Sequence, residues 1–234
     1  MIVGNSCKKI TDGLKEININ VEDLDGILIT HEHLDHVKGL SVLSKKYNIP
    51  IYANEKTLKS INQVITNSPI NLFKTNEKFE IKDLQINPFS IPHDAQDPCG
   101  FSIFNNDKKI TIATDIGHME KSTLNNIIGS SFVLLESNYE PEMLKCSNYP
   151  YMLKRRILGP NGHLSNEEAG EALSILTKNG INNVMLGHLS QQNNFPELAY
   201  KTVVESLINN NIDTTKIKLN VATRTSPDDI IDIA

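Results

Sequence analysis

The residues best suited to chemistry in this chain lie together in one short segment. His31, His33, Asp35 and His36 fall within six residues, directly after the apolar run Gly26–Thr30 and ahead of a helical stretch. Imidazole and carboxylate groups are common metal ligands, and a tight loop after a strand can turn His31 and His33 to one side and the other pair to a neighbouring position. This spacing favours two adjacent metal ions over one.

Three more candidate ligands, His93, Asp115 and His188, each follow an apolar run of strand length. The end of a strand is a position where a scaffold holds a side chain rigidly. Taken alone, each of these residues is as readily a hydrogen-bonded loop or cap residue. Together with the first segment they complete two sets of ligands, so the sequence predicts a site for two metal ions.

Strands and helices are expected to alternate on either side of a central block of consecutive strands. The expected strands cover residues 26–30, 50–53, 78–81, 84–91, 100–104, 109–114, 131–136, 183–186 and 216–222, and the expected helices cover 34–47, 55–64, 140–158, a stretch from 165 onward and 196–209. Ser165 with Glu168 three residues later is a capping box, a common start of a helix. Because no linker rich in Pro, Gly or Ser separates these elements, we predict one α/β domain over residues 1–234, with sheets in the middle and helices on both outer faces.

Composition narrows the class of protein. The chain has 234 residues, of which 39% are apolar and 22% charged, as in ordinary globular proteins. Its net charge of −5 excludes a uniformly basic surface for nucleic acid but leaves room for a local basic groove. The apolar runs are far shorter than the ~20 residues that span a bilayer, and no signal peptide is evident, so we expect a cytoplasmic chain that does not enter a membrane. Cys7, Cys99 and Cys146 are too widely separated for a disulfide framework.

At His31-x-His33-x-Asp35-His36, with His93, Asp115 and His188 following in order, the sequence resembles the metallo-β-lactamase superfamily of binuclear metallohydrolases. Later stretches resemble, more narrowly, the bacterial YycJ/WalJ (VicX) group. They are Ile-Pro-His93-Asp-Ala, Ala-Thr-Asp115-Ile-Gly-His118, Leu-Leu-Glu136-Ser-Asn, Tyr-Pro-Tyr-Met-Leu-Lys-Arg-Arg, Gly-His163-Leu-Ser-Asn and Gly-His188-Leu-Ser. The resemblance implies a four-layer αββα sandwich and DNA exonuclease activity, with 5′ to 3′ polarity on duplex DNA.

The resemblance also implies how the ligands divide between the ions. Carried over position by position, it assigns His31, His33 and His93 to one metal, Asp35, His36 and His188 to the other, and Asp115 to a bridge between them. Nitrogen and oxygen ligands without thiolate suit Zn²⁺, Mn²⁺ or Fe²⁺. Two such ions would present a bridging hydroxide to an electrophilic phosphorus or carbonyl, which makes hydrolysis the expected chemistry and Asp35 one of the residues on which it depends.

Other residues are candidates for binding or assisting the substrate. His163, in the loop Gly-Pro-Asn-Gly-His, is expected either to contact the scissile phosphate and assist the leaving group or to serve as a structural cap. The triplet Lys154, Arg155 and Arg156, with Tyr149 and Tyr151 beside it, is expected either to track DNA phosphates or to be a solvated helix face. Glu136 and Asn138 are placed to orient ligand imidazoles.

Two alternatives to the nuclease remain open on the sequence. One is a small-molecule hydrolase on the same scaffold, such as a glyoxalase-II-like thioesterase or a lactamase. The other is a degenerate member that binds metal without turnover. Members of the group usually open with a β-hairpin and a strand ending in Asp-Ala-Gly, whereas Ile2, Val3 and Gly4 stand at that point here. We therefore expect the opening strands to be missing.

Overall fold

The computed structural model describes residues 4–61, 65, 68–223, 231 and 233. It divides into two compact units, one formed by the chain up to Ser90 with Ala95–Cys99, and one formed by Ile91–Asp94 with Gly100–Thr223. How the units combine decides whether residues 1–234 form one domain, so that expectation stays a prediction. The expectation for Ile2 and Val3 falls outside the described residues.

The first unit contains a small parallel sheet with β2 at its centre. Its strands are β1 (Ile27–Leu28), β2 (Ile51–Asn54) and β3 (Ile70–Phe73). The apolar runs that predicted the first two strands are buried, as expected for strands covered on both faces. The same unit contains an antiparallel hairpin of β4 (Phe79–Ile81) and β5 (Leu84–Ser90). Both strands were predicted.

The helices of the first unit are α1 (Cys7–Glu16), a 3₁₀ turn η1 (Val21–Asp23), α2 (Leu34–Val37), α3 (Leu40–Tyr47) and α4 (Glu55–Ile61). The single helix predicted over 34–47 is wrong, because the chain breaks at Lys38 and Gly39. A Cβ at Gly39 would collide with the carbonyl oxygen of Asn5 and lie 3.2 Å from the backbone nitrogen of Cys7. Close backbone packing therefore ends one helix before the next begins. Residues 62–64 of the predicted helix 55–64 lie outside the described residues.

The second unit contains a mixed sheet whose strands follow the order β10-β9-β8-β7-β6. Their bounds are Cys99–Asn105 for β6, Lys108–Ala113 for β7, Phe132–Glu136 for β8, Asn183–Gly187 for β9 and Lys218–Val221 for β10. The β6–β7 pair is antiparallel and the remaining pairs are parallel, which agrees with a strand block followed by alternation. The carboxyl ends of β8 and β9 consequently meet at one edge, where Glu136 pairs in register with Gly187.

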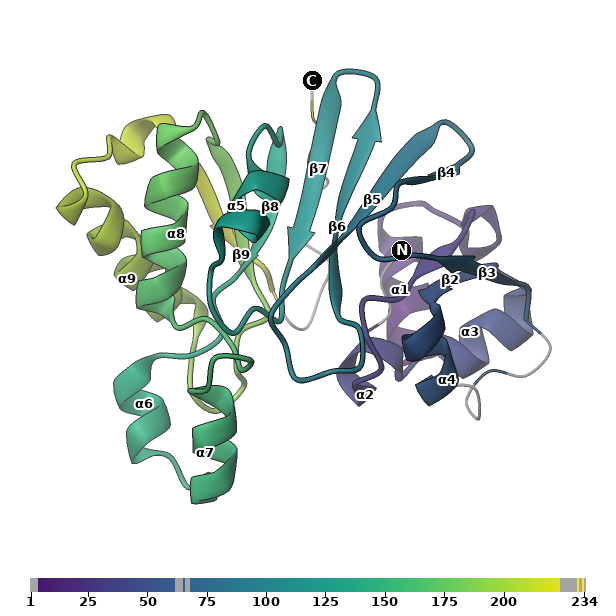
Figure 1. The fold of residues 1–234 in the computed structure, drawn as a ribbon, viewed down its shortest axis with the longest axis horizontal. Coiled ribbons are helices and arrows are strands. Elements are labelled where there is room, and N and C mark those ends of the chain that lie inside the picture. Colours follow the sequence, from purple (N-terminus) through teal and green to yellow (C-terminus); the bar gives the residue numbers. More distant parts are fainter. Residues whose placement is uncertain (1–3, 62–64, 66–67, 224–230, 232, 234) are drawn as a thin grey trace. The chain divides into compact units, whose positions relative to one another are not determined.

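Helices of the second unit are α5 (Lys121–Ile127), α6 (Pro141–Cys146), α7 (Tyr151–Ile157), α8 (Asn166–Lys178) and α9 (Pro196–Asn209), with a 3₁₀ turn η2 (Thr214–Lys216). Figure 1 shows α6 and α7 as a pair of short helices set apart from the longer α8 and α9. The capping box of Ser165 and Glu168 opens α8 as predicted. The expected helix over 140–158 is two helices, because Pro150 cannot donate the hydrogen bond that would continue the first.

The observed elements confirm the α/β class. In the part of the chain that the structure describes, no helix has the length and apolarity needed to cross a bilayer.

Candidate metal centre

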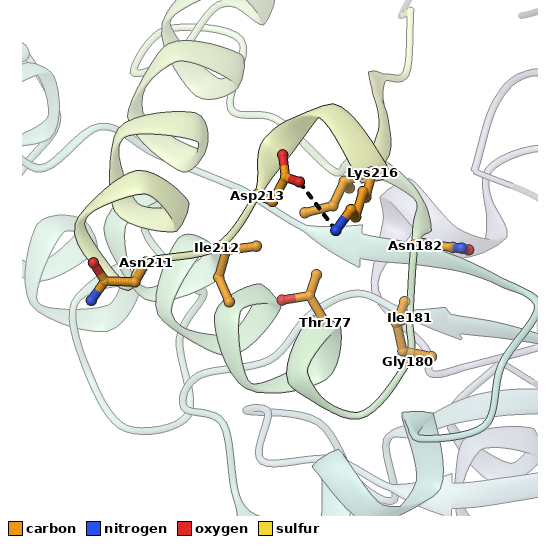
Figure 2. Close-up of a pocket in the computed structure, with 9 residues that line it drawn as sticks. Thr177, Gly180, Ile181, Asn182, Asn211, Ile212, Asp213 and Lys216 are labelled. Atoms are coloured by element: carbon orange, nitrogen blue, oxygen red, sulfur yellow. Dashed lines mark ion pairs between the residues drawn. The ribbon is translucent and has the colours of Figure 1, made fainter.

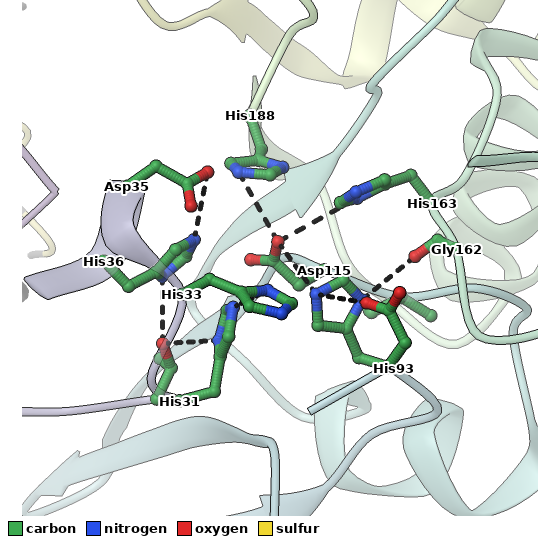
Figure 3. Close-up of polar contacts among 12 residues, drawn as sticks. His31, His33, Asp35, His36, His93, Asp115, Gly162, His163 and His188 are labelled. Carbon is green, nitrogen blue, oxygen red and sulfur yellow. Dashed lines mark hydrogen bonds and ion pairs between the residues drawn. The ribbon is translucent and has the colours of Figure 1, made fainter. Parts of the chain in front are cut away.

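The histidine-rich segment of the first unit lies between β1 and α2, with His33 at the residue that begins the helix. Nε2 of His31 lies 3.0 Å from Nδ1 of His33, and Nε2 of His36 lies 3.9 Å from a carboxylate oxygen of Asp35 (Figure 3). His31 and His36 are buried, while Asp35 is exposed. The segment thus gathers nitrogen and oxygen donors, the donor set of Zn²⁺, Mn²⁺ or Fe²⁺.

Thr30, the residue before this segment, orients two of its imidazoles. The buried Oγ1 of Thr30 lies 3.1 Å from Nδ1 of His31 and 3.0 Å from Nδ1 of His36. A polar partner on one ring nitrogen fixes the orientation of an imidazole, and the other nitrogen can then bind a metal ion. The buried threonine that follows β1 therefore orients two of the predicted ligands.

The predicted ligands of the second unit surround Asp115. Its Oδ1 lies 3.7 Å from Nε2 of His93, 3.5 Å from Nε2 of His188 and 3.9 Å from Nδ1 of His163 (Figure 3). The ligand atoms of Asp115, Glu136, His163 and His188 all lie within 4.8 Å of one another, a spacing that could hold a metal ion. His93, Asp115 and His188 among these residues are predicted ligands, and imidazole and carboxylate groups are common ligands of divalent cations.

Glu136 is the anchor of this group. Its fully buried carboxylate places Oε1 2.8 Å from Nδ1 of His163 and 2.8 Å from Nδ1 of His188. Its Oε2 accepts hydrogen bonds from the backbone nitrogens of Ile116, at 2.6 Å, and Leu164, at 3.3 Å. The contacts expected of a residue that orients imidazoles are therefore present at Glu136. No pattern in the sequence placed Glu136 among the ligands, although a buried acid at the end of a strand needs polar partners.

Glu136 and His163 shift the pKa of each other towards their charged forms. Burial favours the neutral form of Glu136, but the charge of His163 and the hydrogen bonds to His163 and His188 outweigh it, so the pKa of Glu136 lies well below its usual range. Burial lowers the pKa of His163, yet the charge and hydrogen bond of Glu136 are stronger and raise it on balance. Glu136 thus favours the protonated form of His163.

Asn138 supports His188 from the same strand end as Glu136. Its Nδ2 donates a 2.7 Å hydrogen bond to the carbonyl oxygen of His188 and lies 3.3 Å from Nδ1 of that residue. Asn138 is buried, so the amide is fixed. Asn138 therefore holds the backbone of this predicted ligand, while Glu136 accepts the hydrogen of its Nδ1.

His93 is held by backbone on its far side. Its Nδ1 lies 3.1 Å from the carbonyl oxygen of Gly162, which can only accept, so Nδ1 carries the hydrogen and Nε2 presents its lone pair towards Asp115. Burial lowers the pKa of His93 and so favours the neutral imidazole. A neutral imidazole is the form that binds a metal.

Backbone contacts tie together the segments that carry His93, Asp115 and His163. The Gly117 nitrogen donates a 2.8 Å hydrogen bond to the carbonyl oxygen of Pro92. A Cβ at Gly117 would lie 2.6 Å from the Gly162 nitrogen, and one at Gly162 would lie 2.6 Å from the Ile157 carbonyl carbon. Because real Cβ atoms do not approach so closely, only glycine allows these loops to meet.

Two of the predicted ligands have a left-handed backbone. Asp115 has φ of 61° and His188 has φ of 58°, whereas the other described non-glycine residues with positive φ are five asparagines and Lys82. This conformation is uncommon for residues other than Gly, Asn and Asp, and it is retained where the surroundings enforce it, often at functional sites. It marks Asp115 and His188 independently of their side chains, and nothing in the sequence signals it.

The basic triplet is divided among different partners. Arg156 forms an ion pair with Asp94, with a second hydrogen bond of 3.1 Å, and Asp94 directly follows His93. Lys154 donates a 2.6 Å hydrogen bond to the carbonyl oxygen of Lys145, and the Arg155 guanidinium lies 5.9 Å from the ring centre of Tyr151. The three cations therefore do not act as one group.

His118, which the motifs also include, lies beside the same loop as His163. Its Nδ1 lies 2.8 Å from the carbonyl oxygen of Pro160, and its Nε2 lies 3.2 Å from Glu120. Both contacts are made at the half-exposed surface, so they are consistent with a structural residue.

A separate cavity of about 280 Å³ lies in the second unit between the end of α8 and the 3₁₀ turn η2 (Figure 2). Thr177, Ile181 and Ile212 line it together with the ion pair of Asp213 and Lys216, whose charged atoms are 3.3 Å apart. Its lining holds none of the predicted ligands, so this cavity is not part of the metal centre.

Comparisons with known proteins identify the family of this chain. A family model described as a beta-lactamase superfamily domain matches residues 13–189. The chain is 38% identical to Exodeoxyribonuclease YycJ of Bacillus anthracis over 203 residues, which are 85% of this chain and 77% of that protein. It is 39% identical to Exodeoxyribonuclease WalJ of Streptococcus pneumoniae over 209 residues, which are 87% of this chain and 78% of that protein.

Solved structures show the same fold. The metallo-β-lactamase fold protein YhfI of Bacillus subtilis matches with a TM-score of 0.64 at 14% identity, over 89% of this chain and 79% of that chain. Zn²⁺-bound PqqB of Methylobacterium extorquens matches with a TM-score of 0.62 at 18% identity, over 88% and 73%. The predicted metallo-β-lactamase fold is therefore confirmed. This fold implies binding of divalent metal, for which the histidines and carboxylates above are the candidate ligands. The chain belongs to the metallo-β-lactamase superfamily and, within it, to the YycJ/WalJ group.

Proposed function

We propose that this chain is a metal-dependent phosphodiesterase that shortens DNA from an end in the cytoplasm, with 5′ to 3′ polarity on duplex DNA. The observation that carries the proposal is the identity of 38–39% to proteins named exodeoxyribonucleases, over more than three quarters of their length. The predicted ligands fit the donor set of such a centre, and Asp115 lies among histidines as a bridging residue must.

The proposal assigns the ligands as the superfamily pattern predicts. His31, His33 and His93 would hold one divalent ion, Asp35, His36 and His188 would hold another, and Asp115 would be shared between them. When bound, two ions of Zn²⁺, Mn²⁺ or Fe²⁺ lower the pKa of a bridging water and stabilise the negative charge that develops on the phosphate.

The residues of the chain itself have separate tasks in this hydrolysis. His163, protonated through its ion pair with Glu136, donates a proton to the oxygen that leaves phosphorus. Glu136 holds His163 and His188 in fixed orientations, so the proton donor and a metal ligand keep their positions while the substrate reacts. Gly162 fixes His93 in the tautomer that a metal needs.

The test is digestion of end-labelled duplex and single-stranded DNA with added Mn²⁺ or Zn²⁺, beside a small phosphodiester reporter. We expect stepwise shortening from one end, which Asp35→Ala abolishes and the exposed control Asp12→Ala leaves unchanged. If the protein binds two metals while every phosphodiester stays intact, the nuclease proposal fails and a thioesterase or a metal-binding protein without turnover replaces it.

The role of His163 has its own test. His163→Ala is expected to lower kcat on DNA at least 100-fold at full metal content, because a missing proton donor typically costs 10²- to 10⁴-fold. A leaving group that needs no proton, such as p-nitrophenolate in the reporter, should suffer much less. Equal losses on both substrates would contradict proton donation.

A further inference from the structure

We propose that α7 carries a stacking platform, formed by Tyr151 and Arg155, that binds an unpaired base at the end of a DNA strand. This inference rests on the proposed function, since it names the part of the substrate that the second unit recognises. It separates the basic triplet into a residue that binds substrate, Arg155, and a residue that positions the site, Arg156.

The platform consists of side chains that the fold leaves exposed. Tyr151 is 72% exposed and its neighbour Met152 is 70% exposed, among the largest values for apolar side chains in the described residues. The opposite face of α7 is used for packing, because Ile157 is buried with Leu144 of α6 and Leu153 packs against them. The two helices therefore have a small core of their own and do not need Tyr151 for it.

Tyr151 and Arg155 form one surface. They are four residues apart on the helix, and the guanidinium carbon lies 5.9 Å from the centre of the aromatic ring. This cation–π contact holds both planar groups in place before any ligand arrives. Bases stack on the faces of tyrosine rings and of arginine guanidinium groups, and they do so only when they are unpaired and splayed from a duplex.

The charge of α7 selects nucleic acid among the partners that could cover this face. The helix contains Lys154, Arg155 and Arg156 and no acidic residue, within a chain of net charge −5. Phosphates of a strand complement such a helix, whereas a second copy of this acidic chain would bury cations beside an apolar patch. An aromatic ring set among cations is the usual composition of a surface that binds single strands.

The platform is connected to the candidate centre within the second unit. The chain passes directly from α7 to the loop that contains His163. The backbone nitrogen of His163 donates a 3.1 Å hydrogen bond to the carbonyl oxygen of Ile157, the last residue of α7. Arg156 pairs with Asp94, the neighbour of His93. A strand end that stacks on Tyr151 and Arg155 is therefore bound by α7. The carboxyl end of this helix contacts His163 and Asp94, the neighbour of His93.

The experiment measures binding of the full-length, metal-loaded protein to duplex DNA with a short 5′ overhang. All linkages are phosphorothioates, which resist cleavage, and one overhang carries normal bases while another is abasic. Removing either the overhanging base or the Tyr151 ring abolishes one stacking contact, which weakens binding about 5- to 100-fold. We expect wild type to bind the normal overhang about 10-fold more tightly than the abasic one by fluorescence anisotropy.

The variants decide between stacking and charge. Tyr151→Ala and, independently, Arg155→Ala should bind both overhangs with the weaker affinity, whereas Tyr151→Phe should retain the preference. Tyr200→Ala, which removes an exposed tyrosine of α9, should leave the preference unchanged. The platform is refuted if Tyr151→Ala keeps the 10-fold preference, or if wild type binds the two overhangs equally.

Two further results separate this inference from the proposed function and from another occupant. Preference for normal bases without cleavage of ordinary DNA would support the platform and refute the nuclease, while cleavage without the preference would do the reverse. Light scattering gives the mass of wild type and Tyr151→Ala. A loss of dimers in the variant would show that a second copy covers Tyr151, and would overturn the assignment to DNA.

Discussion

Oε1 of Glu136 and Nδ1 of His188 lie 2.8 Å apart at the adjoining ends of two parallel strands. Glu136 is the last residue of β8, and His188 directly follows Gly187, the residue of β9 that pairs with Glu136. The sheet therefore brings Glu136 next to the end of β9, and the left-handed residue that follows this strand supplies the imidazole. The same carboxylate holds His163, so one buried residue fixes two members of the candidate centre.

Replacing the charge of Glu136 should destabilise the fold. Glu136→Gln keeps the shape but leaves buried donors of His163 and His188 without an anionic acceptor, and we expect the free energy of unfolding to fall by about 2–4 kcal/mol. Urea denaturation of the metal-free protein measures this change. Glu197→Gln, at an exposed position of α9, serves as the matched control and should leave the midpoint where it is. A stable Glu136→Gln protein would show that the ion pair is not structural.

Metal should stabilise the folded chain through the candidate ligands. A ligand present at about 100 times its dissociation constant raises the free energy of unfolding by about 2.7 kcal/mol. We expect a chelator to lower the melting temperature and added Zn²⁺ or Mn²⁺ to restore it, as followed by calorimetry with elemental analysis. His93→Ala should reduce the rise, and Lys178→Ala should not. A melting temperature indifferent to metal would argue against a site of useful affinity.

Close packing of α8 on α9 makes Gly170 indispensable. Helix propensity alone favours Gly170→Ala by about 1 kcal/mol. A Cβ at this position, however, would collide with the Cβ of Ser206 and lie 2.7 Å from its Oγ. We expect a net loss of about 1–3 kcal/mol of unfolding free energy in chemical denaturation. The double variant with Ser206→Gly should recover most of it; an additive double variant would disprove the contact.

Gly129 tests the cost of left-handed backbone where packing plays no part. Its φ is +82°, and a Cβ there would meet nothing within 4 Å. Gly129→Ala should therefore lower the unfolding free energy by about 1 kcal/mol through conformation alone. Gly129→Asn should cost less, because asparagine tolerates this region, as five asparagines with positive φ in this chain illustrate. Equal stabilities of all three proteins would exclude strain as the reason.

The cysteines should report folding through their reactivity. Burial raises the pKa of the Cys99 thiol well above its usual range, whereas Cys146 is exposed. A thiol reagent is expected to modify Cys146 within the native state and Cys99 only after denaturant is added, as resolved by mass spectrometry of peptides. Rapid native labelling of Cys99 would mean that the end of β6 opens readily.

Much of the architecture followed from patterns that are local in the sequence. The strands around Glu136 and Val184 are buried apolar runs, and the capping box at Ser165 starts α8 where it should. Helix α1, strand β3 and helix α5 were not anticipated. β3 exposes Ile70 and Leu72, so it lacks the buried pattern of a strand, and its pairing with β2 depends on a partner distant in sequence.

The candidate centre was predictable as a set of residues and not as an arrangement. The spacing of His31, His33 and His36 identifies donors because adjacent positions on a loop must lie close together. The anchoring by Glu136 depends on two strands being neighbours, and the left-handed backbone of Asp115 depends on tertiary packing. Neither is encoded in a local pattern, so sequence reasoning had to leave both open.

The backbone contact between Gly117 and the loop of Gly162 has a consequence for how this protein changes over time. Because backbone atoms of these two segments contact each other directly, the distance between His163 and Asp115 does not depend on the size of the surrounding side chains. Neighbouring residues can then be replaced by residues of other size or polarity while His163 and Asp115 keep their positions. Relatives that act on different substrates could share this frame, provided that both glycines persist.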